Sequence, residues 1–92
     1  MERDAIKAAI IRIFDEKFEI VGPGVDDNLR DAYEFDSIDA VELLREIEIL
    51  LDTRLTQAEK KNAMDIRTIN QIVDYIEALV RDRSLAKSPG PA

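Results

Sequence analysis

Apolar residues recur at three- and four-residue steps in several segments of the chain, the spacing that places them on one face of a helix. In residues 4–18 this stripe consists of Ile6, Ala9, Ile10, Ile13 and Phe14. The stretch "VGPG" follows at residues 21–24, and glycine next to proline cannot continue a helix. The pattern therefore predicts a first helix over residues 4–18.

A second helix is predicted to begin at Asp36 or Ser37, because either side chain can accept hydrogen bonds from the free N–H groups of a first helical turn. Asp39 and Glu42 then suit the positive end of the helix dipole. The apolar positions that give this helix a buried face are Leu43, Leu44, Ile47 and Leu51.

Two later segments open with a capping-box pattern, in which a threonine and a Glu or Gln three positions on satisfy a helix N-terminus. The stretch "TQAE", residues 56–59, predicts a short third helix that ends near residues 62–64. The stretch "TINQ", residues 68–71, predicts a last helix with the apolar stripe Ile69, Ile72, Val73, Ile76, Leu79 and Val80.

Together these segments predict an all-α fold, because no strand alternation is visible. The expected architecture is a four-helix bundle with a long loop between the first and second helices and a short third helix. Loops as long as residues 19–36 are often functional, and Leu29 is the expected anchor of this one to the core. Residues 1–83 are the predicted helical domain, and residues 84–92, "SLAKSPGPA", have the composition of a disordered tail.

The charge of the chain narrows the choice of partners. Its 92 residues include 13 Lys and Arg against 20 Asp and Glu, a net charge of -7. Such a surface repels nucleic-acid phosphates and anionic lipids and attracts proteins with basic patches. The N-terminal segment lacks the apolar region of a signal peptide, and no apolar run approaches the roughly 18 residues of a membrane span. We therefore expect a cytoplasmic monomer that binds no nucleic acid and does not insert into membranes.

Catalysis and metal binding are disfavoured by the residues that the chain lacks. It contains neither histidine nor cysteine, so Ser37 has no common general base and thiolate chemistry is excluded. An EF-hand loop counted from Asp26 places Asn28 correctly, but Arg30 stands at the fifth position and Asp31 where glycine belongs. We therefore predict neither an enzyme nor a metal site.

The stretch "FDSIDAVELL", residues 35–44, resembles the D-S-L-D-x-V-E-L signature of acyl carrier proteins, with Ile38 in the leucine position. The resemblance continues through "DTRL" at residues 52–55 and "INQIVDYI" at residues 69–76, and so extends over nearly the whole chain. In this family a phosphopantetheinyl transferase moves 4'-phosphopantetheine from coenzyme A to the serine that aligns with Ser37. The thiol of that arm then carries acyl groups as thioesters. The resemblance implies a carrier in a fatty-acid or a specialised lipid or polyketide-type pathway.

The resemblance also implies that the second helix docks onto basic patches of enzymes that load, elongate or transfer acyl groups. The candidate docking residues are Asp36, Ile38, Asp39, Val41, Glu42, Glu46 and Glu48. The alternative interpretation is core packing for Ile38 and Val41 and a merely solvated face for the acids. A carrier must also shield its acyl chain in transit, which predicts an apolar cleft lined by Leu43, Ile47, Leu55, Ile69 and Ile72.

Departures from the family pattern leave the partners and the pathway open. Glu34 and Phe35 stand where a glycine and a small residue are usual, and Arg45 replaces an apolar residue that partners often touch. Two alternatives to the carrier interpretation remain. In one, Ser37 is only an N-cap; in the other, the chain is a helical adaptor that keeps the carrier fold and never receives the arm.

Overall fold

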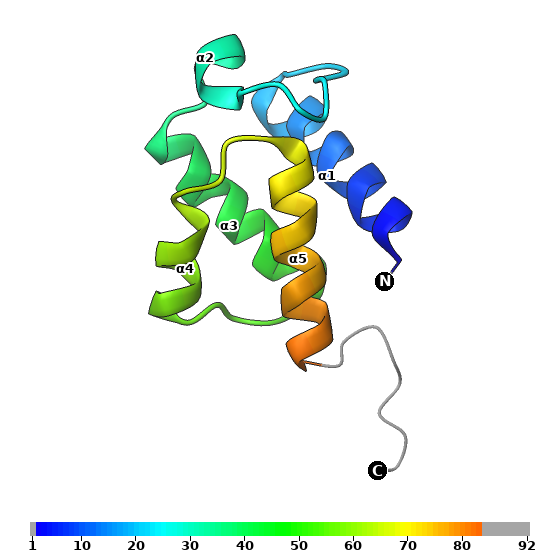
Figure 1. The fold of residues 1–92 in the computed structure, drawn as a ribbon, viewed down its shortest axis with the longest axis vertical. Coiled ribbons are helices and arrows are strands. Elements are labelled where there is room, and N and C mark those ends of the chain that lie inside the picture. Colours follow the sequence, from blue (N-terminus) through cyan, green and yellow to red (C-terminus); the bar gives the residue numbers. More distant parts are fainter. Residues whose placement is uncertain (1, 84–92) are drawn as a thin grey trace.

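The computed structural model describes residues 2–83, and the predicted tail, residues 84–92, lies outside the described residues. The described chain is all-helical, which confirms the predicted fold class. The helices are α1 (Arg3–Phe18), α2 (Leu29–Tyr33), α3 (Ser37–Leu51), α4 (Gln57–Ala63) and α5 (Ile69–Arg83) (Figure 1). The four predicted helices are α1, α3, α4 and α5.

Helix α2 lies inside the connection that was predicted to be a loop. It forms because the Asn28 side chain accepts a hydrogen bond from the Asp31 N–H at 3.0 Å and so caps a single helical turn. A helix of five residues is too short to produce a readable hydrophobic period, so the sequence pattern could not reveal it.

The core is the apolar interior between α1, α3 and α5. Helix α1 packs along α5 and against α3, and α4 lies beside α3 on the other side of the bundle (Figure 1). The largest side chains that are fully buried are Phe14, Ile6, Ile10, Leu29, Ile47, Ile69, Ile72, Ile76 and Val73. Leu29 is 1% exposed, which confirms it as the anchor of the long connection.

The long connection crosses one end of the bundle and is fixed there to the start of α5. Helix α1 ends at Phe18, before "VGPG", because Glu19 takes a left-handed backbone conformation at φ 56°. The Asn70 N–H donates to the Val25 carbonyl at 3.0 Å, and the Leu29 N–H donates to the Arg67 carbonyl at 2.7 Å. These bonds place α2 directly beside the segment that joins α4 to α5.

Candidate functional site

Ser37 is the first residue of α3, and its neighbour Asp36 supplies the helix cap. The Asp36 Oδ1 atom accepts hydrogen bonds from the N–H groups of Ile38 at 3.0 Å and Asp39 at 3.1 Å. In return, the Asp39 carboxylate accepts from the Asp36 N–H at 3.2 Å, which completes a capping box. Ser37 is therefore not the N-cap, and the interpretation of this serine as only a capping residue is wrong. Its side chain is exposed at the helix N-terminus.

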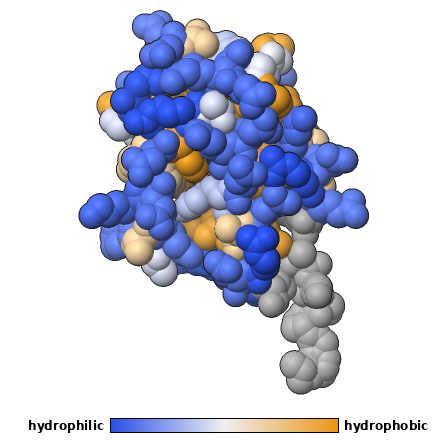
Figure 2. Space-filling view, in the orientation of Figure 1, coloured by the Kyte–Doolittle hydropathy of each residue, from blue (hydrophilic) through white to orange (hydrophobic). Residues whose placement is uncertain are grey.

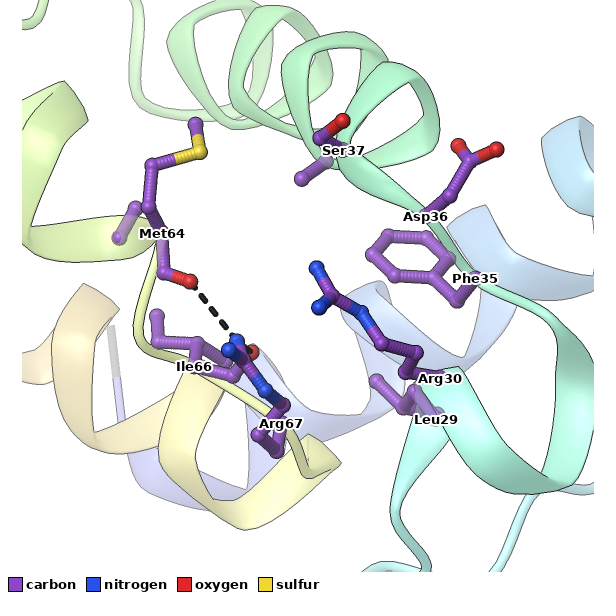
Figure 3. A pocket seen from close by; sticks show the side chains of 10 residues that line it. Leu29, Arg30, Phe35, Asp36, Ser37, Met64, Ile66 and Arg67 are labelled. Carbon is purple, nitrogen blue, oxygen red and sulfur yellow. Dashed lines mark hydrogen bonds between the residues drawn. The ribbon is translucent and has the colours of Figure 1, made fainter.

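A small cavity opens beside Ser37, between the start of α3, helix α2 and the α4–α5 connection (Figure 3). Its volume is about 20 Å³, enough for about one water molecule. Its wall combines apolar side chains with two arginines, and consists of Leu29, Arg30, Phe35, Asp36, Ser37, Ala40, Ala63, Met64, Ile66 and Arg67.

A second cavity of about 20 Å³ lies deeper, where α3 faces α4 and α5. Its lining residues are Leu29, Phe35, Ala40, Leu43, Leu44, Ile47, Ala63, Ile66, Ile72 and Tyr75. Half of these residues also line the cavity beside Ser37, so the two cavities are neighbours that share apolar side chains in their walls. Figure 2 shows apolar side chains at the bottom of a hollow between α4 and α5, on a face that is otherwise largely hydrophilic. We call the two cavities together the apolar crevice.

The crevice contains part of the set of cleft residues expected from the sequence. Leu43, Ile47 and Ile72 line its deeper cavity. Leu55 and Ile69 are buried but line neither cavity. Leu55 follows the far end of α3, where its N–H donates to the Glu48 carboxylate at 2.8 Å. Sequence reasoning missed the lining residues Phe35, Ala40, Ala63, Ile66 and Tyr75, because which side chains enclose the cavity depends on how α3, α4, α5 and their connections pack together.

The residues expected to dock partners lie on or near the outer face of α3. Ile38 is 76% exposed and Val41 is 60% exposed, so core packing does not account for either residue. Asp36 and Glu42 are also exposed, whereas Asp39, Glu46 and Glu48 are half-buried. Two of the acids have structural partners as well, since Asp39 belongs to the capping box and Glu48 holds the Leu55 N–H.

Farther along α3, its outer surface adjoins positively charged residues of α3 and α4. Arg45 lies between Val41 and Glu48 and shares a surface hollow with Leu44, Lys60 and Met64. Lys61 is exposed on α4. The outer face of α3 is thus acidic and apolar at its start and of mixed charge farther along the helix.

At the inner end of the crevice, Tyr75 connects α5 to α4. Its hydroxyl donates a hydrogen bond to the Glu59 carbonyl at 2.7 Å, and burial raises the pKa of Tyr75 to about 12. The Glu59 carboxylate also forms an ion pair with Arg83 and accepts from the Thr56 N–H at 2.8 Å. These contacts hold the pKa of Glu59 at about 2, with the Arg83 hydrogen bond as the largest cause.

Among residues 2–83, no side chain is hydrogen-bonded to Ser37 in a way that would make it a nucleophile for autonomous catalysis. The carboxylate that lines its cavity is that of Asp36, whose Oδ1 atom accepts hydrogen bonds from the backbone N–H groups of Ile38 and Asp39. Residues 2–83 contain no cluster of three or more His, Cys, Asp or Glu able to hold a metal ion. Over the same residues, no helix has the length and apolar character needed to cross a membrane. An exposed hydroxyl in this setting is suited to be modified by another protein.

Comparison with known protein families assigns the chain to one of them. Residues 4–76 match the family model described as the phosphopantetheine attachment site. No curated protein and no solved structure matches the chain. Domains of this family are non-catalytic carriers to which 4'-phosphopantetheine is covalently attached, and they interact with phosphopantetheinyl transferases and acyl-handling enzymes. Because the match covers most of its length, the chain belongs to the phosphopantetheine attachment site family, in agreement with its resemblance to acyl carrier proteins.

Proposed function

We propose that this protein is an acyl carrier protein whose 4'-phosphopantetheine arm is attached to Ser37. The observation that carries the proposal is the position of the Ser37 hydroxyl, which is exposed next to a completed capping box and at the rim of the apolar crevice. In the attachment step the Ser37 oxygen forms a bond to the phosphorus that bears the pantetheine of coenzyme A. The pyrophosphate bond breaks, 3',5'-ADP leaves, and the serine proton passes to a base of the transferase.

The residues around Ser37 fit such a group. The arm supplies a thiol, which this cysteine-free chain lacks, and the thiol holds an acyl group as a thioester. The fixed cap keeps the start of α3 rigid while leaving the Ser37 side chain accessible to the transferase. Arg30 and Arg67 line the same cavity and suit the negative charge of a phosphodiester.

The apolar crevice supports a second part of the proposal, the shielding of an acyl chain. Its two cavities lead from Ser37 toward Tyr75 between aliphatic side chains such as Leu43, Ile47 and Ile72. At about 20 Å³ each they are too small for an acyl chain, so the chain enters by displacing side chains. Aliphatic groups can change rotamer there without leaving a buried polar group unsatisfied.

The outer face of α3 supports the proposed docking of partner enzymes. Ile38 and Val41 are large apolar side chains exposed beside Ser37, and Asp36 and Glu42 add negative charge to the same end of the helix. This combination suits a basic patch with an apolar centre. We place the carrier in the cytoplasm as a monomer, serving fatty-acid synthesis or a specialised lipid or polyketide-type pathway.

Intact-mass spectrometry tests the attachment. The protein is incubated with coenzyme A, Mg²⁺ and a permissive phosphopantetheinyl transferase, and the mass of one phosphopantetheinyl group is expected to be added. Ser37→Ala should abolish the addition, whereas Ser84→Ala and Ser88→Ala, which change the other two serines, should leave it intact. An unchanged mass of the parent protein would contradict the proposal and favour the unmodified helical adaptor.

A further inference from the structure

Two arginines face the cavity beside Ser37. Arg30 belongs to α2 and Arg67 to the α4–α5 connection, and both line the cavity. Figure 3 shows the Arg30 guanidinium extending into the space below Ser37, whereas the Arg67 guanidinium lies at the wall of this space, beside the Met64 and Ile66 carbonyls. The hydrogen bond from the Leu29 N–H to the Arg67 carbonyl, at 2.7 Å, joins the two segments at this point. The segments that carry the two arginines therefore lie side by side, and both cations line the same cavity.

The Arg67 side chain is held in place by the connection that it belongs to. Its Nη1 atom donates to the carbonyl oxygens of Met64 at 2.7 Å and Ile66 at 3.0 Å. The Arg67 N–H donates to Gln71 Oε1 at 2.6 Å, which fixes the backbone of this residue as well. The Nε and Nη2 atoms make no hydrogen bond within residues 2–83, so they are oriented donors that remain for a ligand.

Within the part of the chain that the structure describes, neither guanidinium has an acidic partner, although acids outnumber bases in the sequence. Within the described residues no carboxylate forms an ion pair with Arg30 or Arg67. Asp36 lines the same cavity, but its Oδ1 atom is used by the backbone of α3. Because both cations line one cavity, an anion placed in that cavity is attracted by each of them.

We propose that Arg30 and Arg67 bind the phosphodiester of the arm attached to Ser37. This inference rests on the proposed function, because the ligand is the arm itself. Its phosphorus is bonded to the oxygen of Ser37, a residue that lines the same cavity as the two arginines. A phosphodiester carries one negative charge on two non-bridging oxygens, which match the paired N–H donors of a guanidinium.

Binding of the phosphate would give the arm a direction. With its phosphate held on the side of α2 and the α4–α5 connection, the remainder of the arm starts at the mouth of the apolar crevice. A partner enzyme that draws the arm out must first break the arginine contacts. The two arginines thus favour the state in which the cargo is shielded.

The test uses the arm-bearing protein and phosphorus NMR. The position and relaxation rate of the arm's ³¹P resonance are compared for the parent protein, Arg30→Gln, Arg67→Gln and the double variant. Arg81→Gln, on the exposed side of α5, is the control that removes the same charge elsewhere. We expect a shifted resonance and slower transverse relaxation in each single variant, a larger change in the double variant, and none in the control. Added salt should move the parent resonance toward that of the double variant.

Intact mass, measured first on every sample, separates two kinds of failure. A complete adduct whose resonance is the same in the parent, the double variant and the control would overturn this inference and leave the proposed function standing. Absence of an adduct would overturn both. Because Arg30 is exposed and makes no hydrogen bond within residues 2–83, Arg30→Gln tests the inference without disturbing the fold. Amide spectra of the Arg67 variants show whether the α4–α5 connection is retained.

Discussion

Removing the charge of Glu59 should destabilise the protein at neutral pH. This side chain connects the first turn of α4 to the C-terminal end of α5, at the end of the bundle away from Ser37 (Figure 1). Its carboxylate pairs with Arg83 and accepts from the Thr56 N–H at 2.8 Å. Glu59→Gln is the informative change, since glutamine retains an oxygen that can complete the capping box and loses only the charge.

The size of the effect follows from the lowered pKa of Glu59. A carboxyl pKa of about 2 in the folded protein, against an ordinary value of 4.5, corresponds to at most about 3 kcal/mol of stabilisation at neutral pH. Solvent reaches 23% of the Glu59 side chain and 20% of the Arg83 side chain, and partly exposed ion pairs contribute less than buried geometry suggests. We therefore expect Glu59→Gln to lower the free energy of unfolding by about 1–2 kcal/mol at pH 7.

The pH dependence has a defined sign. Because folding lowers the pKa of Glu59, its contribution is present above the ordinary value of 4.5 and is lost as the pH falls toward about 2. Urea unfolding of the parent and Glu59→Gln, followed by circular dichroism at a series of pH values, should show two stability curves that converge across this range. The difference between the curves isolates Glu59 from the other carboxylates.

A matched control is the exposed pair of Arg12 and Glu16 on α1, whose side chains are 77% and 55% exposed. Glu16→Gln should lower the free energy of unfolding by less than about 0.5 kcal/mol. Equal losses for Glu59→Gln and Glu16→Gln at pH 7, or curves for Glu59→Gln that stay parallel down to pH 2, would refute the assignment of Glu59 as the main ionic link between α4 and α5.

Three further outcomes are expected. Glu34 has a left-handed backbone at φ 55°, so Glu34→Gly should raise the free energy of unfolding by about 1 kcal/mol in urea melts, whereas Glu34→Ala, which keeps the Cβ atom, should not. Glu42→Lys should slow transfer of the arm to Ser37, and adding Asp39→Lys should slow it further, because both changes oppose docking to a basic patch. Unchanged transfer rates would show that these acids are not part of the docking face. Thermal melts of each variant control for the loss of the Asp39 capping contact. An octanoyl group on the arm should raise the melting temperature above that of the acetyl form and shift the methyl signals of Leu43 and Ile72, and the absence of both effects would contradict shielding in the crevice.

The sequence predicted the elements whose residues carry a long hydrophobic period or a capping pattern. Helix α4 is only seven residues long, yet its start at Thr56 was readable because Thr56 and Glu59 form a capping box. Helix α2 was missed because its cap residue Asn28 is followed by too few residues to show a stripe. Ser37 was predicted as the attachment residue from its flanking residues. The sequence left open whether Asp36 or Ser37 caps α3, and the structure shows that Asp36 is the N-cap.

The lining of the crevice and the arginine pair are tertiary properties. Ile66 and Arg67 carry no periodic signal, because they lie in a connection whose path is set by bonds such as that between the Leu29 N–H and the Arg67 carbonyl. Arg30 stood out in the sequence only as a residue that spoils a calcium-binding pattern. Its position facing Ser37 depends on α2, the helix that the sequence pattern did not reveal.

Phe35 explains how the site tolerates a large residue directly before the Asp36–Ser37 pair. Its ring centroid lies 5.2 Å from that of Phe14 and 5.3 Å from that of Phe18, so the side chain packs against the C-terminal half of α1. The same side chain also lines both cavities of the crevice. If an acyl chain enters the crevice as proposed, it contacts a residue that packs against α1 and precedes Asp36, the cap of α3. A displacement of Phe35 by such a chain would then act directly on the start of α3, where partner enzymes are proposed to dock.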